Sequence, residues 1–286
     1  ESVELNYEVE KWDTTGNSYI WVQVPELSGT NTFIWACWGN SAHAYVPDYT
    51  TDGSTWEDNY VGVWHLNETS GQHEDSTANA NNSSAVTVSQ QGIAEGQVDG
   101  ATNFDGIDDS VTIPAISLTT NTVTWEAWVK GYKAGYAGLI FMRGTDPHAS
   151  GMNLYDNKIG WHWLNDSAYS DTMILPSDEL IHVAIVVTPT RIYTYTNGVN
   201  PAGQYWSRTV NNEDFSSANL MIGEDTSETR HWDGIIDEAR FSKVYRSNDW
   251  LRACYLNQAS NSVFNNYGSV ADPQYLYYQE TFEEVA

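Results

Sequence analysis

Short strand-like runs separated by polar turns are the feature that most constrains how this chain folds. The runs are rich in Val, Ile, Thr, Tyr and Trp, and clusters of Gly, Asn, Asp and Ser separate them. Helical periodicity is nearly absent. The runs lie at residues 18–24, 32–38, 110–113, 123–130, 138–142, 158–164, 181–187, 191–196, 219–222 and 234–241. This pattern predicts an all-β fold, a two-sheet antiparallel jelly-roll sandwich.

The length of the chain suggests one large unit with a small companion. A chain of 286 residues is long for one compact domain and short for two. We predict a small β-rich N-terminal domain at 1–58, the sandwich at 59–261 and a C-terminal extension at 262–286. Short helical segments are predicted at 177–180 and 247–256, the second capped by Ser247 or Asn248.

The charge balance excludes several classes of partner. Lys and Arg number 12 and Asp and Glu number 38, so the net charge is −26. A nucleic-acid-binding protein needs a basic surface, and an anionic membrane repels an acidic chain. No apolar run reaches the roughly 18 residues of a membrane span. High solubility, a salty environment and binding of divalent cations remain open. An anionic polysaccharide is disfavoured as a ligand unless calcium bridges it.

Several segments together resemble one known family. The segment 98–113 reads Val-Asp-Gly-Ala-Thr-Asn-Phe-Asp-Gly-Ile-Asp-Asp-Ser-Val-Thr-Ile, and 234–241 reads Gly-Ile-Ile-Asp-Glu-Ala-Arg-Phe. With 124–130 and a hairpin whose Asn197-Gly198 pair predicts a type I′ turn, they resemble laminin-G-like, concanavalin A-like jelly-roll modules. The likeness covers about 63–258. Leu180 or Ile181 stands where the family usually has Trp.

The resemblance implies an exported, extracellular or cell-surface protein. Residues 21–68 resemble an uncharacterised domain that precedes such modules in bacterial and archaeal surface proteins. No signal peptide is visible from Glu1 onward, so we expect any export signal to be outside this sequence. Cys37 and Cys254 both depart from the family pattern, and an extracellular setting favours a disulfide between them. Two buried free thiols are the alternative.

The carboxylate pattern argues against catalysis. Glucanases of this class carry acid groups on alternate residues of one strand, so that they share a face. Here Asp237 and Glu238 are adjacent and are expected on opposite faces, and Glu126 stands alone on its strand. Nucleophile and zinc motifs are also missing from the sequence. The prediction is a non-catalytic protein, with a polysaccharide hydrolase or lyase as an alternative.

Calcium is the predicted cofactor. The residues Asp105, Asp108 and Asp109 crowd a glycine-containing turn, and Asp237 is on the closing strand. Calcium prefers oxygen ligands, and the family resemblance implies a calcium ion. The alternatives are a plain turn with solvated acids, or a rival site at Glu224, Asp225 and Asp233.

Aromatic residues suggest the ligand. Sugars stack their C–H faces on aromatic rings, while polar neighbours bind the hydroxyl groups. The rings of Trp35, Trp64 and Trp125 are expected in the core. The predicted ligand-binding residues, for which a core role is the alternative, are Trp161, Trp163, Tyr193, Trp206, Trp232 and Arg230.

The sequence thus predicts a lectin-like module that binds extracellular glycan, with calcium. A structural or adhesive module is the alternative. Such a module would assemble by strand addition, pairing with other copies through residues 262–286.

Overall fold

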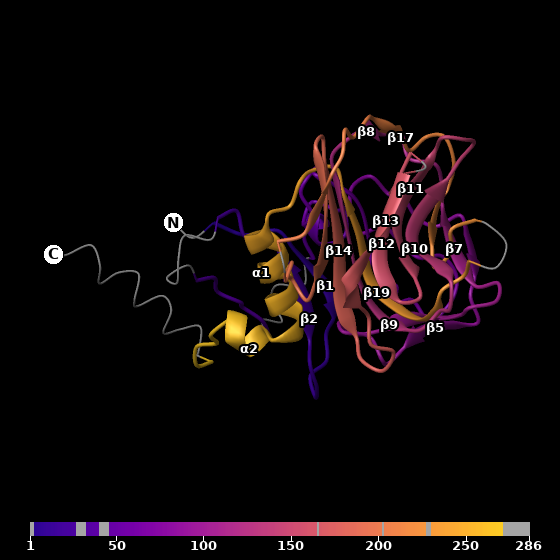
Figure 1. The fold of residues 1–286 in the computed structure, drawn as a ribbon. Helices are drawn as coiled ribbons and strands as arrows, with labels where there is room; N and C mark the ends of the chain where they lie inside the picture. Colours follow the sequence, from indigo (N-terminus) through magenta and orange to yellow (C-terminus); the bar gives the residue numbers. More distant parts are fainter. Residues whose placement is uncertain are drawn as a thin grey trace.

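The chain forms a two-layer β-sandwich with a third, partial layer on one side (Figure 1). This computed structural model describes residues 3–26, 33–39, 46–164, 166–201, 203–226 and 230–270. The predicted all-β jelly-roll class is confirmed, with antiparallel pairing throughout the described strands.

One layer, which we call the front sheet, follows the order β13-β12-β11-β10-β18-β7-β4. Its middle strands are joined by tight turns, and the β10–β11 and β11–β12 pairs run in register over most of their length. Its strands are β4 (Ala85–Thr87), β7 (Ser110–Ile113), β10 (Tyr136–Arg143), β11 (Ala149–Tyr155), β12 (Lys158–Trp163), β13 (Asp166–Ile174) and β18 (Leu220–Ile222).

The other layer, the back sheet, follows the order β16-β15-β14-β9-β19-β6-β5, and β3 also pairs with β19. Two short strands, β8 (Thr119–Thr120) and β17 (Glu213–Asp214), pair at one end of the sandwich. The strands of the back sheet are β3 (Tyr60–Trp64), β5 (Gln90–Ile93), β6 (Ala101–Asp105), β9 (Val123–Gly131), β14 (Ile181–Thr188), β15 (Arg191–Thr196), β16 (Tyr205–Ser207) and β19 (Asp233–Ser242).

The core lies between the two sheets, because alternate residues of each strand point inward. Trp64, Trp125 and Phe241 are completely buried there. This placement confirms the predicted core role of Trp64 and Trp125. Trp35 is 63% exposed, so the prediction that it belongs to the core is wrong.

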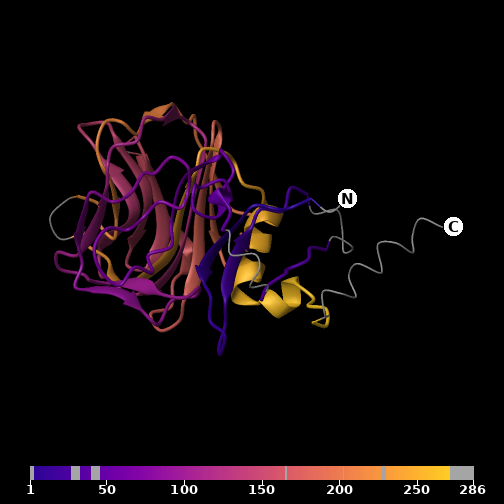
Figure 2. The same ribbon diagram turned by 180° about the vertical axis from the view of Figure 1, so that it is seen from behind.

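The third layer covers the outer face of the back sheet (Figures 1 and 2). It contains the hairpin of β1 (Tyr7–Lys11) and β2 (Tyr19–Val22) and the helices α1 (Asn248–Ala259) and α2 (Asn261–Phe264). A short 3-10 turn, η2 (Asp48–Thr50), packs beside β1. Leu251 of α1 packs on Ala184 and Val186 of the back sheet. None of the helices within the described ranges is long and apolar enough to cross a membrane.

Nine of the ten predicted strand runs overlap strands of the structure. Residues 33–38 form no strand, and 177–179 form a bend instead of a helical turn. The predicted helix is α1, and Ser247 caps it by accepting a hydrogen bond from the Trp250 N–H. The predicted extension starts within α2, and its residues 271–286 lie outside the described residues.

Candidate functional site

Three of the tryptophans that the sequence suggested as sugar-stacking residues are in the core. Trp161 and Trp232 are completely buried, and Trp163 is 4% exposed. Trp161 and Trp163 share one face of β12, as the alternation predicts, but it is the inner face. The prediction that these three rings form a ligand surface is wrong, because burying their large apolar area stabilises the sandwich.

The other predicted ligand residues are partly exposed and lie on different faces. Tyr193 packs on the outer face of the back sheet, and Trp206 packs partly against the core from the neighbouring strand. Arg230 lies beside the front sheet, with its guanidinium carbon 4.8 Å from the ring centre of Tyr136. Of these residues, Arg230 borders the aromatic surface described next.

Three tyrosines gather on the outer face of the front sheet. Tyr136 on β10 pairs directly with Tyr155 on β11, and Tyr169 lies on β13. The ring centroids of Tyr136 and Tyr155 are 4.6 Å apart, and those of Tyr169 lie 5.8 and 5.7 Å from them. Tyr136 is 39% exposed and Tyr155 38%. These three residues, which we call the tyrosine platform, form an accessible group of rings on which a sugar can stack.

Gly160 allows the Tyr169 ring to lie across the neighbouring strand. The two residues are paired in register, and a Cβ at position 160 would be 2.2 Å from the Tyr169 ring. Asn153 Nδ2 donates a hydrogen bond to the Tyr169 hydroxyl at 2.9 Å, and His162 Nε2 is 3.0 Å from the same oxygen. Burial raises the pKa of Tyr169 to about 12 and lowers that of His162 to about 4, so both are uncharged at neutral pH. One hydrogen bond therefore joins the Tyr169 hydroxyl to Nε2, and the tautomer of the neutral imidazole decides which of the two atoms donates.

A buried aspartate and two arginines border the platform. Asp225 Oδ2 accepts hydrogen bonds from Arg143 Nη2 and Arg230 Nη1, both at 3.1 Å. The Asp225 carbonyl also accepts from Arg143 Nε at 3.0 Å. Because two guanidinium groups already occupy this carboxylate, the rival calcium site at Glu224, Asp225 and Asp233 is not assembled.

The tyrosine platform was not predicted from the sequence, although the sequence contains a signal for it. His162 lies between two core tryptophans, so alternation puts it on the outer face of β12. The register then brings Gly160, Asn153 and Tyr169 to that same face. Without the register, however, nothing in the sequence shows that these residues are neighbours.

Three of the four predicted calcium ligands come together at the turn between β6 and β7. One carboxylate oxygen from each of Asp105, Asp108 and Asp109 lies within 4.8 Å of the others. Two oxygens of this group already accept backbone N–H groups of the turn, and Lys133 Nζ donates to the Gly106 carbonyl at 2.6 Å. Calcium takes about six to eight oxygen ligands. The turn fits a calcium ion only if water supplies the remaining ligands.

Asp237, the fourth predicted ligand, is not part of this turn. Asp233 pairs with Asp105, and Asp237 is four residues further along β19, roughly 13 Å away. Its Oδ2 accepts the backbone N–H groups of Gln97 at 2.6 Å and Val98 at 3.1 Å. Burial, followed by the neighbouring charge of Glu238, raises the pKa of Asp237 well above its usual value.

A β-bulge in β19 overturns the prediction that Asp237 and Glu238 point to opposite faces. Ile236 and Ala239 both point into the core, so one extra residue is accommodated between them. Glu238 has a φ of 52°, in the left-handed region that is costly for a residue with a side chain. Both carboxylates consequently face the layer that covers the back sheet.

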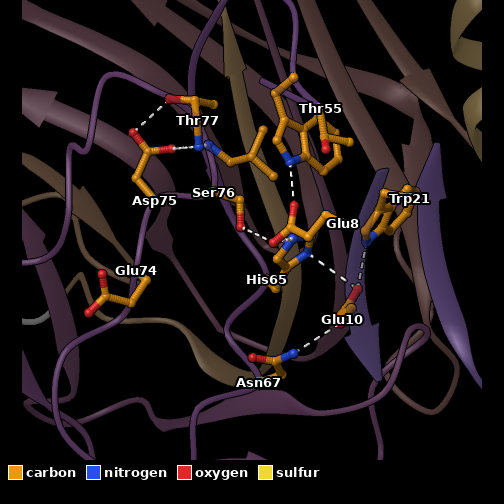
Figure 3. Close-up of polar contacts among 12 residues, drawn as sticks. Glu8, Glu10, Trp21, Thr55, His65, Asn67, Glu74, Asp75, Ser76 and Thr77 are labelled. Carbon is orange, nitrogen blue, oxygen red and sulfur yellow. Dashed lines mark hydrogen bonds and ion pairs between the residues drawn. The ribbon is translucent and has the colours of Figure 1, made fainter. Parts of the chain in front are cut away.

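A buried group of ionisable side chains joins the N-terminal hairpin to the back sheet, and Figure 3 shows Glu8, Glu10 and His65 of this group. We call Glu8, Glu10, His65, Glu238 and Arg240 the hairpin clamp. His65 Nδ1 is 2.6 Å from Glu238 Oε1 and 3.5 Å from Glu10 Oε2, and its Nε2 is 3.6 Å from Glu8 Oε1. Strand β1 thus contributes two carboxylates to a histidine that belongs to the sandwich.

Two tryptophans complete the clamp. The indole N–H of Trp21 donates to Glu10 Oε2 at 2.7 Å, and that of Trp56 donates to Glu8 Oε2 at 2.6 Å. The Arg240 guanidinium carbon is 4.5 Å from the ring centre of Trp21 and 5.2 Å from that of Trp56. No local pattern predicts this cluster, because its members come from three distant segments.

The electrostatics of the clamp fit a shared proton better than a metal ion. Burial, followed by the charge of Glu238, raises the pKa of Glu10 to about 7. Burial alone would lower the pKa of His65, but the charges of Glu238 and Glu10 raise it well above its usual value. The 2.6 Å between His65 Nδ1 and Glu238 Oε1 is a hydrogen-bond distance, whereas two ligands of one tetrahedral zinc lie roughly 3.3 Å apart.

The predicted disulfide is not formed. Cys37 and Cys254 are both free. Cys37 is exposed, while Cys254 is on α1 and is half-buried. Burial, followed by the charge of Glu126, raises the pKa of Cys254 to about 12. Both thiols are therefore free, but the alternative of two buried thiols is also wrong, because Cys37 is exposed and Cys254 is only half-buried.

Comparisons with solved structures support the fold. Domain 4 of AbnA, a GH43 extracellular arabinanase from Geobacillus stearothermophilus solved with arabinotriose, superposes with a TM-score of 0.54 at 16% identity. That match covers 68% of this chain and 97% of that one. The binding domain of Paraclostridial Mosquitocidal Protein 1 gives 0.56 at 14% identity, over 73% of this chain and 53% of that one. Trypanosoma rangeli sialidase in complex with sialic acid gives a TM-score of 0.51 at 14% identity, over 76% of this chain and 35% of that one.

The sequence matches a family model. A search of curated proteins finds no match. Residues 104–252, just over half of the chain, match the family model described as the concanavalin A-like lectin/glucanases superfamily. The matched region extends from β6 to α1, and so contains the strands of the tyrosine platform and the whole of β19. The chain belongs to the concanavalin A-like lectin/glucanases superfamily.

Proposed function

We propose that this protein is a non-catalytic carbohydrate-binding module that acts outside the cell and holds a glycan on the tyrosine platform. The observation that carries the proposal is the platform itself, three mutually contacting rings of which two are more than one-third exposed. Neither the hairpin nor α1 covers this face of the sandwich (Figure 1). Stacking rings beside amide and imidazole groups are typical of a shallow sugar-binding surface.

Two further points support the proposal. The superfamily includes lectins, and a structural neighbour of similar fold was solved with arabinotriose. Glycoside hydrolysis requires two carboxyl groups that can reach the scissile bond. Asp225, the carboxylate beside the platform, is buried and held by both arginines, so it serves neither as acid nor as nucleophile.

We also propose calcium as a structural ion of the β6–β7 turn. Three clustered carboxylates in a chain of net charge −26 support this, because a divalent cation relieves their mutual repulsion. Calcium is expected to raise the melting temperature and EDTA to lower it. The variant Asp108→Asn should reduce that difference. Identical melting temperatures in calcium and EDTA would remove the ion from the proposal.

The proposed function is tested by a glycan-array screen of the purified protein. The double variant Tyr136→Ala/Tyr155→Ala removes both exposed rings of the platform. Tyr205→Ala is the matched control, because Tyr205 is 45% exposed but belongs to the back sheet. Binding by the wild type and the control, and its loss in the double variant, is the expected result. Failure of the wild type to bind any glycan would refute the proposal.

A further inference from the structure

We infer that the tyrosine platform selects an uncharged sugar, which stacks on the ring of Tyr169. This inference rests on the proposed function and adds the chemical class of the ligand. It follows from the pairing of the charges around the platform, from two unpartnered polar atoms and from the placement of one glycine.

The cations nearest the platform are already paired with acids. Arg143 and Arg230 share the buried carboxylate of Asp225, and each is 3.1 Å from its Oδ2. Lys158, opposite Tyr155 on the next strand, is 2.9 Å from Asp171 Oδ1. A sugar carboxylate would have to compete with these acids for each cation. Each of these cations is thus part of an ion pair, so an anionic ligand gains less from it than from a free cation.

The charge of the whole protein acts in the same direction. A net charge of −26 repels a polyanion, and at about 0.1 M salt this repulsion is screened only beyond roughly 10 Å. An uncharged glycan approaches without this penalty. Its affinity should then depend little on ionic strength.

Two polar atoms beside Tyr169 lack a hydrogen-bond partner among the described residues. These are Asn153 Oδ1, an acceptor, and His162 Nδ1, which donates or accepts according to the tautomer of the neutral ring. Leaving a buried donor or acceptor unpaired costs about 1–3 kcal/mol, so a ligand or water that bonds them is favoured. A hydroxyl group can donate to Asn153 and can either donate to or accept from His162, whereas a carboxylate can only accept. The pair therefore matches the chemistry of a neutral sugar.

Gly160 is the positioning residue for the stacking ring. A Cβ at this position would lie within 2.2 Å of Tyr169 Cδ1 and 2.6 Å of Cε1. Even an alanine would push the phenol away from the sheet and weaken its bonds to Asn153 and His162. The surface on which a sugar stacks thus depends on the absence of a side chain at Gly160.

The test compares neutral polysaccharides with derivatives of the same backbones carboxylated at C6. Affinity for the full-length chain is measured by calorimetry at low and high salt. We expect binding of at least one neutral polymer, little change with salt, and roughly tenfold weaker binding of its carboxylated form. The variants Tyr169→Ala and Gly160→Ala should each weaken neutral binding roughly tenfold. Tyr169→Leu repeats the test with a bulkier apolar replacement if either variant fails to fold, and Tyr205→Ala is the unaffected control.

The outcomes separate this inference from the proposed function. Tighter binding of carboxylated polymers that still requires Tyr136 and Tyr155 would overturn the inference and leave the proposed function standing. Neutral binding that is unchanged in folded Tyr169 variants would overturn the assigned stacking ring. Absence of binding to every polymer in both series would overturn both proposals.

Discussion

Glu10 in the hairpin clamp makes the stability of the protein depend on pH. Its pKa is raised from 4.5 to about 7, so the folded state holds this proton more tightly than the unfolded state does. The stabilising contribution is complete below pH 4.5 and is lost as the pH rises to about 7. The shift, 7 − 4.5 or 2.5 units at about 1.36 kcal/mol each, corresponds to about 3 kcal/mol.

The variant Glu10→Gln keeps the shape of the protonated side chain and cannot ionise. It loses part of the hydrogen bonding to Trp21 and Asn67, worth about 1 kcal/mol. At about pH 8 the variant should therefore be more stable than the wild type by about 2 kcal/mol, and at about pH 4.5 less stable by about 1 kcal/mol. The two pH profiles should cross.

Urea unfolding across this pH range measures the difference, and hydrogen exchange of the segment from β1 to β2 shows whether the hairpin itself is affected. Glu95→Gln is the control, because that carboxylate is on the surface and its side chain is 66% exposed. The remaining clamp groups stay in both proteins. The raised pKa of His65 also favours acidic conditions, whereas the lowered pKa values of Glu8 and Glu238 oppose strong acid. Parallel profiles for the wild type and Glu10→Gln would refute this account of the clamp.

Three further predictions concern the core, the clamp and the thiols. Trp232→Ala should destabilise the fold by about 3–5 kcal/mol in urea unfolding, because its ring is completely buried; a loss under 1 kcal/mol would contradict a core role. Arg240→Ala should cost about 3–5 kcal/mol by breaking a buried ion pair and leaving Glu238 with only His65 as a cationic partner, and Arg240→Lys should recover part of this loss. A thiol reagent should modify Cys37 rapidly in the native protein and Cys254 much more slowly, as followed by mass spectrometry; equal rates would contradict the partial burial and raised pKa of Cys254.

The sandwich was predictable from the sequence because period-two alternation and turn residues are local signals. The predicted run at 191–196 coincides with β15, and the one at 110–113 coincides with β7. The Ser247 cap of α1 is equally local, since it needs one hydroxyl three residues before an N–H group. These features can be predicted without knowing which strands pair with one another.

The site was harder to predict because it depends on register and on long-range contacts. The alternation predicts that Trp161 and Trp163 share one face of their strand, but it does not predict whether that face is buried or exposed. In the structure it is buried. The bulge at Glu238 turns its carboxylate to the same face of the sheet as that of Asp237, and no local sequence pattern predicts the bulge. The tyrosine platform likewise requires residues from β10, β11 and β13 to be aligned, which is a property of the folded sheet.

The position of the covering layer has a geometric consequence for any assembly that contains this protein. Strand β1 and helix α2 both lie behind the back sheet, on the side opposite the tyrosine platform (Figures 1 and 2). Two packed sheets, which lie roughly 10 Å apart, therefore separate the tyrosine platform from any polypeptide joined to either element. The tyrosine platform can then lie flat against a polymer surface. Polypeptides attached to the covering layer remain on the opposite side of the sandwich and do not block the platform.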